Sequence, residues 1–320
     1  MNWMLRVDKR VGKKLKHMKY IVTGGAGFIG SHIVDALIAR GDEVHIIDNF
    51  LTGKRERVNP QAILHEIDIR DAEKLPAIFR GAAGIFHTAA QPRMQYSIAQ
   101  PRLTNDINIT GTLNVLLAAR DVGGPKVVYS ASSSAYGSAH PMPLQEDMHP
   151  GPIIPYAIQK RVGEQYCQMV SRFYGLKTVC LRYFNVYGPR QTTDTDGPYA
   201  TVIGIFLGQR EKNQPMTIVS DGTQRRDYTH VRDVARANLL AMTSPHVGAG
   251  EIVNIGTSTN YSVLEITQLI GGPTVFIAPR QGEVDETLAD NRRAKEFLGW
   301  EPQISFEEGI GELKRLHGLS

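Results

Sequence analysis

The chain has 320 residues, which is enough for one large domain or for two lobes with separate cores. Hydrophobic residues make up 42% and charged residues 21%, as in a soluble globular protein, and no apolar run approaches the ~20 residues that span a membrane. The net charge of +4 comes from residues 1–17, which carry +5 and leave −1 for residues 18–320. The body therefore lacks the basic surface of a nucleic-acid-binding protein.

The basic tail, residues 1–17, lacks the apolar stretch of a signal peptide, and Met18 is a plausible native start. We expect this tail to be disordered or to be an artefact of the start codon. The two cysteines, Cys167 and Cys180, show no Cys-x-x-Cys spacing and no cluster of histidines beside them. This pattern argues against a disulfide framework and a metal site, and it favours a reducing, cytoplasmic environment.

Short apolar, β-branched segments alternate with helical segments in the first half of the chain. The predicted strands cover residues 19–24, 43–48, 62–68, 84–90, 125–130 and 177–185. Helical spacing of apolar residues predicts a helix after the first strand, with Gly41 as its stop. Repeated βαβ units predict an α/β fold, a Rossmann-type doubly wound parallel sheet whose strand ends bind ligands.

Beyond about residue 185 the elements become shorter, and glycine and proline are more frequent. We expect residues 18–185 to form the main domain. Residues 186–320 would form mainly a smaller C-terminal lobe that covers the ligand crevice, with some segments returning to the first domain. The stretches PYATVIGIFLGQR and VRDVARANLLAM are predicted as helices of this lobe.

A glycine-rich turn, TGGAGFIG, follows the first strand and opens the first helix. Its glycines, Gly24, Gly27 and Gly30, allow the backbone to approach a pyrophosphate. The helix begins near Phe28 and Ile29, where free N–H groups and the helix dipole favour an anion. The turn therefore predicts a dinucleotide site in the first domain.

Carboxylates end the second and third strands of this domain. Asp48 would accept both hydroxyls of an adenosine ribose and repel a 2′-phosphate, which favours NAD over NADP. The basic pair at 54–55 keeps NADP open as an alternative. Asp68 is positioned to meet the adenine edge, and Asn49 and Ile69, which directly follow the two carboxylates, are assigned to the same site.

Tyr156 and Lys160 lie four residues apart on a predicted helix and therefore share one of its faces. A tyrosine with a pKa of about 10 is a poor base at neutral pH. A nearby ammonium and a positive nicotinamide ring would favour the phenolate and lower that pKa. Ser132, in the segment SASSSAYG, lies 24 residues before Tyr156, at the ligand-binding end of a strand.

The chain resembles the extended short-chain dehydrogenase/reductases, and more narrowly the NAD-dependent nucleotide-sugar epimerases of the UDP-glucose 4-epimerase type. The resemblance covers almost all of the chain except the tail, from Lys19 to about Trp300. It rests on the glycine-rich turn, SASSSAYG, the Tyr-x-x-x-Lys pair, RYFNVYGPRQ and DGTQRRDYTHVRDVARA. It implies a tightly held NAD, and Ala89 and Ala90 match small residues beside the cofactor.

The resemblance also implies catalytic roles. Tyr156 takes a proton from a sugar hydroxyl while the sugar carbon gives a hydride to NAD, and the hydride then returns to the other face of the ketose. Lys160 would hold the nicotinamide ribose, and Ser132 would hydrogen-bond the reacting oxygen. The family resemblance further implies a homodimer through helices near residues 97–120 and 155–173.

The substrate's UDP moiety is matched by residues of the second half. Asn185 in RYFN resembles the asparagine that meets the diphosphate. Arg226 and Arg280 resemble the two arginines that clamp it, since a guanidinium suits bidentate phosphate contact. Glu283 matches an acidic residue near the uridine ribose.

Two serines follow the candidate catalytic serine. Related dehydratases carry Asp-Glu at this point, and related decarboxylases usually keep the Glu, whereas this chain has Ser133 and Ser134. Neither serine can act as an acid or base of useful pKa, so oxidation and return of the hydride are favoured over elimination. Ser133 is also assigned to the substrate site.

Two further positions limit which sugar the substrate can carry. In the resembling epimerases, the residue seven after the clamp arginine lies beside the sugar's C2 substituent, and here it is Thr287, which leaves space for an N-acetyl group. Thr192 stands where members acting on UDP-glucuronate tend to place an arginine.

The sequence therefore predicts 4-epimerisation of UDP-glucose and UDP-galactose, of the N-acetylated pair, or of both. The alternatives are an epimerase or reductase acting on UDP-glucuronate or a dTDP-sugar, and a non-catalytic NAD-binding protein.

Overall fold

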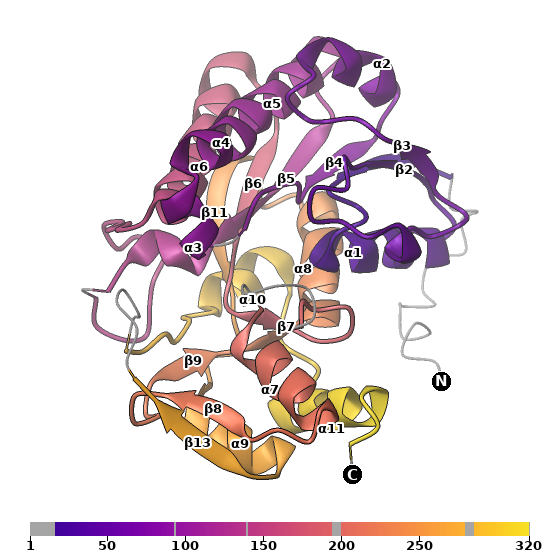
Figure 1. Ribbon diagram of the computed structural model, residues 1–320. Coiled ribbons are helices and arrows are strands. Elements are labelled where there is room, and N and C mark those ends of the chain that lie inside the picture. Colours follow the sequence, from indigo (N-terminus) through magenta and orange to yellow (C-terminus); the bar gives the residue numbers. More distant parts are fainter. Residues whose placement is uncertain (1–16, 93, 139, 194–199, 279–284, 320) are drawn as a thin grey trace.

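The strands predicted in the first domain lie side by side in a seven-stranded parallel sheet (Figure 1). The computed structural model describes residues 17–92, 94–138, 140–193, 200–278 and 285–319. The strands run in the order β11-β6-β5-β4-β1-β2-β3. Their bounds are β1 Lys19–Thr23, β2 Glu43–Ile47, β3 Ile63–His65, β4 Gly84–His87, β5 Lys126–Ser132, β6 Thr178–Tyr183 and β11 Ala249–Ile255.

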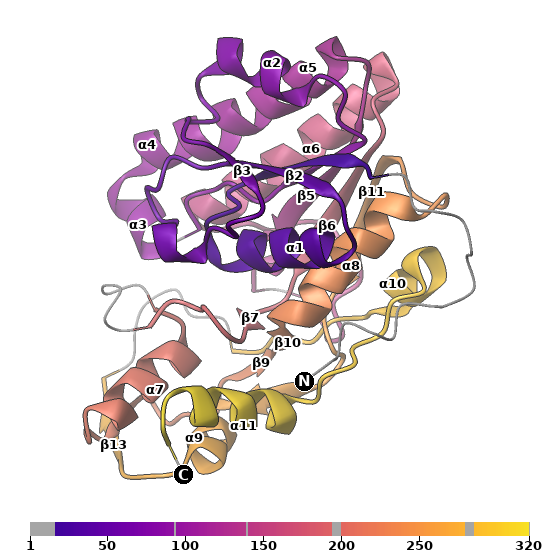
Figure 2. The same cartoon turned by 90° about the vertical axis from the view of Figure 1, so that its right-hand side faces the viewer.

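Helices cover both faces of this sheet (Figure 2). One face is covered by α1 (Phe28–Ala39), α8 (Val231–Thr243) and α10 (Arg292–Leu298). The other is covered by α2 (Leu75–Phe79), α5 (Thr112–Asp121) and α6 (Pro155–Tyr174). Alternate residues of each strand supply the two apolar cores, so Val128 packs toward α1 and α8 while Val127 and Tyr129 pack toward α5 and α6.

A smaller lobe packs a third apolar core between short strand pairs and helices. Its pairs are β7 (Val186–Tyr187) with β10 (Thr229–His230), β8 (Met216–Val219) with β13 (Thr274–Ile277), and β9 (Arg225–Asp227) with β12 (Asn260–Ser262). Its helices are α7 (Val202–Glu211), α9 (Val263–Ile270) and α11 (Phe306–Leu316). In the first domain, α3 (Met94–Ala99), α4 (Pro101–Asn105) and a π-helical stretch (Asp106–Gly111) precede α5.

The assignment of VRDVARANLLAM to the smaller lobe is wrong. This segment forms α8, whose apolar side, including Val234 and Ala241, packs against α1 and the sheet of the first domain. The segment AGEIVNI, which the sequence analysis did not assign, adds β11 to the sheet beside β6. The strands predicted at 62–68 and 84–90 are shorter than expected, since only Ile63–His65 and Gly84–His87 pair. No helix of the described residues is long and apolar enough to cross a membrane.

His87, the last residue of β4, is buried between two threonine hydroxyls. Its Nδ1 lies 2.7 Å from Thr23 Oγ1, and its Nε2 lies 3.0 Å from Thr112 Oγ1. Burial lowers the pKa of His87 from 6.5 to about 3. The unfolded chain binds this proton at a higher pH than the folded chain, so the stability that neutral His87 contributes is present above pH 6.5 and is lost as the pH falls toward 3.

We therefore expect the stability of His87→Gln to depend less on pH than that of the wild type. Between pH 7 and pH 5 the free energy of unfolding should fall by about 2 kcal/mol less in the variant, because the amide takes up no proton. Urea unfolding at the two pH values measures this difference. An equal fall in both proteins would mean that the folded state protonates His87 as readily as the unfolded chain.

Candidate active site

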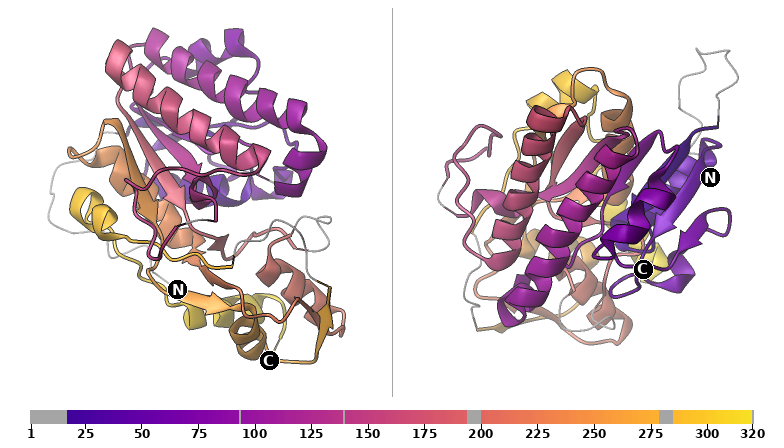
Figure 3. Two further views of the ribbon diagram at one scale, coloured as in Figure 1. Left: turned by 90° about the vertical axis from the view of Figure 1, so that its left-hand side faces the viewer. Right: turned by 90° about the horizontal axis from the view of Figure 1, so that it is seen from above.

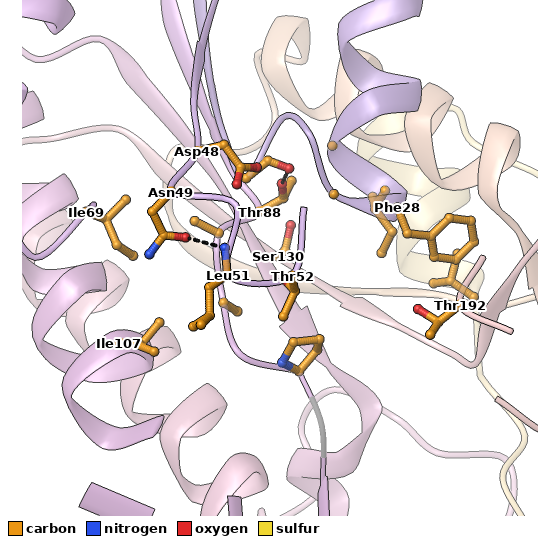
Figure 4. A pocket seen from close by; sticks show the side chains of 18 of the residues that line it. Phe28, Asp48, Asn49, Leu51, Thr52, Ile69, Thr88, Ile107, Ser130 and Thr192 are labelled. Carbon is orange, nitrogen blue, oxygen red and sulfur yellow. Dashed lines mark hydrogen bonds between the residues drawn. The ribbon is translucent and has the colours of Figure 1, made fainter. Parts of the chain in front are cut away.

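A cleft of about 1050 Å3 lies at the carboxyl ends of the parallel strands, where the strand order reverses between β1 and β4 (Figure 4). The residues predicted to bind the cofactor all line it. They are Gly24, Gly27, Phe28, Ile29, Gly30, Asp48, Asn49, Asp68, Ile69, Ala89, Ala90, Tyr156 and Lys160.

The glycine-rich turn brings backbone close to backbone at one end of this cleft. Gly24 has a φ of +73°, and a Cβ there would lie 2.7 Å from the backbone nitrogen of Ala89. A Cβ on Gly30 would collide with the carbonyl oxygen of Gly24. The turn is therefore a cradle that side chains would fill, and it leads into the N-terminus of α1, as a pyrophosphate site requires.

Asp48 lies at the adenosine end of the predicted site. Its carboxylate accepts hydrogen bonds from the backbone N–H groups of Ala26 at 3.0 Å and Phe50 at 2.8 Å. Burial raises the pKa of this carboxyl, and the two backbone donors oppose the rise. Each oxygen accepts one bond from the protein, so lone pairs remain for a ribose hydroxyl.

The Asp68 carboxylate accepts more hydrogen bonds from the protein than the Asp48 carboxylate does. It accepts from Arg70 Nη2 at 2.8 Å, from Arg70 Nε at 3.0 Å and from Asn49 Nδ2 at 2.6 Å. The Arg70 guanidinium is the main reason why the pKa of Asp68 lies below its ordinary value. Contact with an adenine edge therefore stays a prediction for Asp68.

Tyr156 and Lys160 lie together at the other end of the cleft, on α6. The Lys160 Nζ donates to the Ser130 carbonyl at 2.7 Å and lies 6.0 Å from the centre of the Tyr156 ring. Burial raises the pKa of Tyr156 to about 12, opposed by a hydrogen bond with Ser132, and burial lowers the pKa of Lys160 to about 8. The Lys160 ammonium is directed at the Ser130 carbonyl, and the lowering of the tyrosine pKa expected from this ammonium together with the nicotinamide ring stays a prediction.

Ser132 ends β5 beside Tyr156. Its Oγ accepts from the backbone N–H of Ser134 at 3.2 Å and from the Ser134 hydroxyl at 2.9 Å. Both contacts use its lone pairs, so its own hydrogen is the one that it can donate in the hydrogen bond with Tyr156. Ser133 begins a single 3₁₀ turn (Ser133–Tyr136), and no carboxylate stands at positions 133 and 134.

Of the predicted UDP-binding residues, the structure describes Asn185 and Arg226, and neither lines this cleft. Asn185 donates through Nδ2 to the Asp227 carbonyl at 2.8 Å and to Thr287 Oγ1 at 3.2 Å. Arg226 donates to the backbone carbonyls of Arg225 at 2.9 Å and Asp285 at 3.1 Å.

The donors predicted to meet a diphosphate therefore contact the protein. Thr287 lies on an extended segment that hydrogen-bonds to β9, and its hydroxyl also accepts from the Asp227 N–H at 3.3 Å. Arg280 and Glu283 lie outside the described residues.

The cleft residues that the sequence analysis did not assign include three polar ones. Thr88 follows β4, Ser130 lies near the end of β5, and Tyr183 ends β6. Their shared signal is a polar side chain at the carboxyl end of a predicted parallel strand, and Ser130 belongs to the SASSSAYG segment itself.

Comparisons with known proteins agree with this architecture. The model of the NAD-dependent epimerase/dehydratase family matches residues 20–256. A Methanocaldococcus jannaschii protein that carries a provisional UDP-glucose 4-epimerase name is 42% identical over 298 residues, which cover 91% of this chain and 95% of that protein.

Two solved structures extend the likeness to the whole fold. The UDP-glucose 4-epimerase of Thermotoga maritima with UDP-glucose has a TM-score of 0.88 at 39% identity, covering 94% of this chain and 98% of that chain. The UDP-N-acetylglucosamine 4-epimerase of Methanobrevibacter ruminantium has a TM-score of 0.89 at 34% identity, with the same two coverages of 94% and 98%. The chain therefore belongs to the NAD-dependent epimerase/dehydratase family, and its cofactor is NAD.

Proposed function

We propose that the protein interconverts UDP-glucose and UDP-galactose by NAD-dependent epimerisation at C4, with the N-acetylated pair as a second candidate. The observation that carries this proposal is the Tyr156–Lys160 pair at one end of a cleft whose other end is the glycine-rich cradle. The relatives named as UDP-sugar 4-epimerases give the substrate class.

Each catalytic residue has a chemical task in this proposal. NAD, when bound, supplies the hydride acceptor. Tyr156 exchanges a proton with the sugar's C4 hydroxyl, and Ser132 turns its hydrogen from Tyr156 to the same sugar oxygen. Protonated Lys160 favours the phenolate form of Tyr156, and its pKa of about 8 keeps it charged at neutral pH.

The serines at 133 and 134 favour epimerisation over the other reactions of the family. Loss of water from a keto-sugar needs an added base for the C5 proton and an acid for the leaving hydroxyl, and a serine hydroxyl supplies neither near neutral pH. In the proposed reaction the C4 hydride leaves to NAD and returns, the proton of the C4 hydroxyl leaves to Tyr156 and returns, and no other bond of the sugar is broken.

The direct test is incubation of the purified protein with a panel of UDP- and dTDP-sugars, without added cofactor, and separation of the products. Interconversion of UDP-glucose and UDP-galactose would support the proposal, and activity on UDP-N-acetylglucosamine would support Thr287 as a residue that leaves space at C2. UDP-glucuronate should react poorly, since Thr192 offers no cation. Bound NAD without any turnover would instead indicate a non-catalytic binding protein.

We expect Arg226→Met to weaken UDP binding and to leave NAD binding unchanged. In the proposal, the guanidinium exchanges its backbone contacts for the diphosphate, and loss of a charge-assisted contact costs about 1.5–3 kcal/mol, or about a tenfold to hundredfold increase in Kd. Calorimetric titration with UDP measures the change. An unchanged Kd would contradict the assignment of Arg226 to the substrate.

We infer that the protein is a homodimer through α5 and α6, which lie side by side at the surface (Figure 3). Helical spacing places Ile158, Val162, Tyr166, Met169 and Phe173 along one side of α6, and none of them is fully buried. Exposed fractions of 46% for Ile158 and 69% for Phe173 are high for such large apolar side chains. A second copy of the same helix pair would cover this stripe.

We expect Ile158→Glu to convert the dimer into a monomer, because a charge would then be buried in an apolar interface. Ile63→Glu is the matched control, since Ile63 on β3 is 47% exposed and lies outside the helix pair. Light scattering after gel filtration measures the mass of each protein. A monomeric wild type, or a dimeric Ile158→Glu, would contradict this interface.

A further inference from the structure

A chain of buried hydrogen bonds runs from α8 through the ends of β6 and β5 to the cleft. Asn238 Oδ1 lies 3.0 Å from the Tyr183 hydroxyl, which in turn lies 3.0 Å from Ser130 Oγ. Asn238 is fully buried, whereas Tyr183 and Ser130 reach the cleft wall beside Lys160. Figure 4 shows Ser130 among the side chains that line the cleft.

The Val234 carbonyl, at one end of this series of hydrogen bonds, determines which group donates and which accepts in each of them. The Val234 carbonyl can only accept, so the Asn238 atom 2.8 Å from it is the amide nitrogen. Asn238 Oδ1 is then an acceptor, and Tyr183 donates its only hydroxyl hydrogen to it. Tyr183 can therefore only accept from Ser130.

Ser130 consequently donates its one hydroxyl hydrogen to the Tyr183 oxygen. Its Oγ offers the cleft lone pairs alone, so a ligand atom at this place must be a donor. The position is next to Lys160, whose Nζ is held by the Ser130 carbonyl at 2.7 Å, and Tyr156 lies on the same helix face. A neutral N–H donor suits this place better than a second cation would, because like charges repel.

We propose that Ser130 Oγ accepts a hydrogen bond from the carboxamide N–H of the nicotinamide ring, and that Asn238 is a positioning residue that holds Ser130 in the acceptor state. This inference rests on the proposed function, in which the redox end of NAD lies beside Tyr156. A ribose or sugar hydroxyl is the other donor that could reach Ser130, and the experiment below separates the two.

The probe is acetylpyridine adenine dinucleotide, in which a methyl ketone replaces the carboxamide and both N–H donors are lost. The purified protein is equilibrated with equal concentrations of NAD and this analogue, and the bound ratio is measured by mass spectrometry. We expect the wild type to prefer NAD by about five- to tenfold, which is the worth of one hydrogen bond. The measurement requires no turnover, so it remains informative if the proposed epimerisation fails.

Single-residue variants show which side chain is responsible for the preference for NAD over the analogue. Ser130→Ala should bind NAD and the analogue nearly equally, and Ser130→Thr should restore the preference. Asn238→Leu and Tyr183→Phe should each reduce the preference, because without them the Ser130 hydrogen is free to rotate toward the cleft. Having two such variants keeps the test usable if one of them does not fold.

A second buried pair provides the matched control. The Tyr136 hydroxyl donates to Asn254 Oδ1 at 2.7 Å, and neither residue lines the cleft. Asn254→Leu should lose stability as Asn238→Leu does, yet keep the wild-type preference. A wild type with no preference, or a Ser130→Ala that keeps it, would overturn the role of Ser130. If Asn238→Leu and Tyr183→Phe both kept the full preference for NAD, the positioning role of Asn238 would be overturned. If a ribose or sugar hydroxyl is the donor to Ser130, the ratio of bound NAD to bound analogue should be near one in every protein.

Discussion

Replacing Tyr156 by Phe is expected to abolish turnover while the protein stays folded and keeps its NAD. The ring keeps its place on α6, and the change removes only the hydroxyl that exchanges a proton with the sugar. Loss of a positioned proton-transfer group costs on the order of a hundredfold to ten-thousandfold in rate. The measurement is the rate of UDP-galactose formation from UDP-glucose, together with the NAD content of the purified variant.

Two controls separate a chemical effect from a structural one. Tyr136→Phe removes a buried hydroxyl of similarly raised pKa, about 12, outside the cleft, and it should retain most of the activity. In Tyr156→Phe itself, UDP binding should remain unchanged. A Tyr156→Phe protein with activity close to the wild type would mean that another group carries the proton.

Local sequence was sufficient for the parts of the fold and site that depend on neighbouring residues. The first turn is one such part, because Gly24 and Gly30 are needed at a strand-to-helix junction whatever lies elsewhere in the chain. Tyr156 and Lys160 share a face because the helix period dictates it.

Features that depend on distant contacts could not be predicted in this way. The segment VRDVARANLLAM is amphipathic, and its sequence does not tell whether α1 or the smaller lobe covers its apolar side. β11 pairs with β6 across a separation of about 70 residues, and the sequence of a seven-residue strand does not indicate which distant strand it pairs with.

The electrostatic interactions of Tyr156 and Lys160 also depend on contacts that the local sequence does not show. Spacing alone suggested that Lys160 acts on Tyr156, but burial of the tyrosine and the pull of the Ser130 carbonyl on the ammonium arise only in the folded chain. Asn185 is a similar case, since both its engaged partners, Asp227 and Thr287, come from later parts of the sequence.

A buried ion pair holds the helix that carries the catalytic residues against the sheet. Glu164, one turn after Lys160 on α6, accepts from Arg182 Nε at 2.7 Å and from Arg182 Nη2 at 2.8 Å, and both side chains are fully buried. The guanidinium also lies 4.4 Å from the centre of the Tyr136 ring. Glu164 also accepts from Arg161 Nη1 at 2.8 Å, so it is removal of Glu164 that would leave a charge, the Arg182 guanidinium, in the core without its carboxylate.

Glu164→Gln is therefore expected to lower the free energy of unfolding by about 3–5 kcal/mol, because a buried arginine without its carboxylate is strongly unfavourable. In the exposed pair of Arg55 and Glu66, Arg55 Nη2 donates to both carboxylate oxygens at the same distances, 2.7 Å and 2.8 Å, and both side chains are more than half exposed. Glu66→Gln should cost less than about 1 kcal/mol, since solvent screens such a pair. Urea unfolding at neutral pH compares the two variants directly.

A double variant decides whether the charge or the contact matters. If the uncompensated guanidinium causes the loss, Glu164→Met combined with Arg182→Met should recover much of the stability, since apolar residues of similar volume can replace a buried pair at little cost. If the double variant is no more stable than Glu164→Gln, the hydrogen-bond geometry between α6 and β6 carries the stability. Equal losses in Glu164→Gln and Glu66→Gln would contradict the premise that burial makes this pair critical.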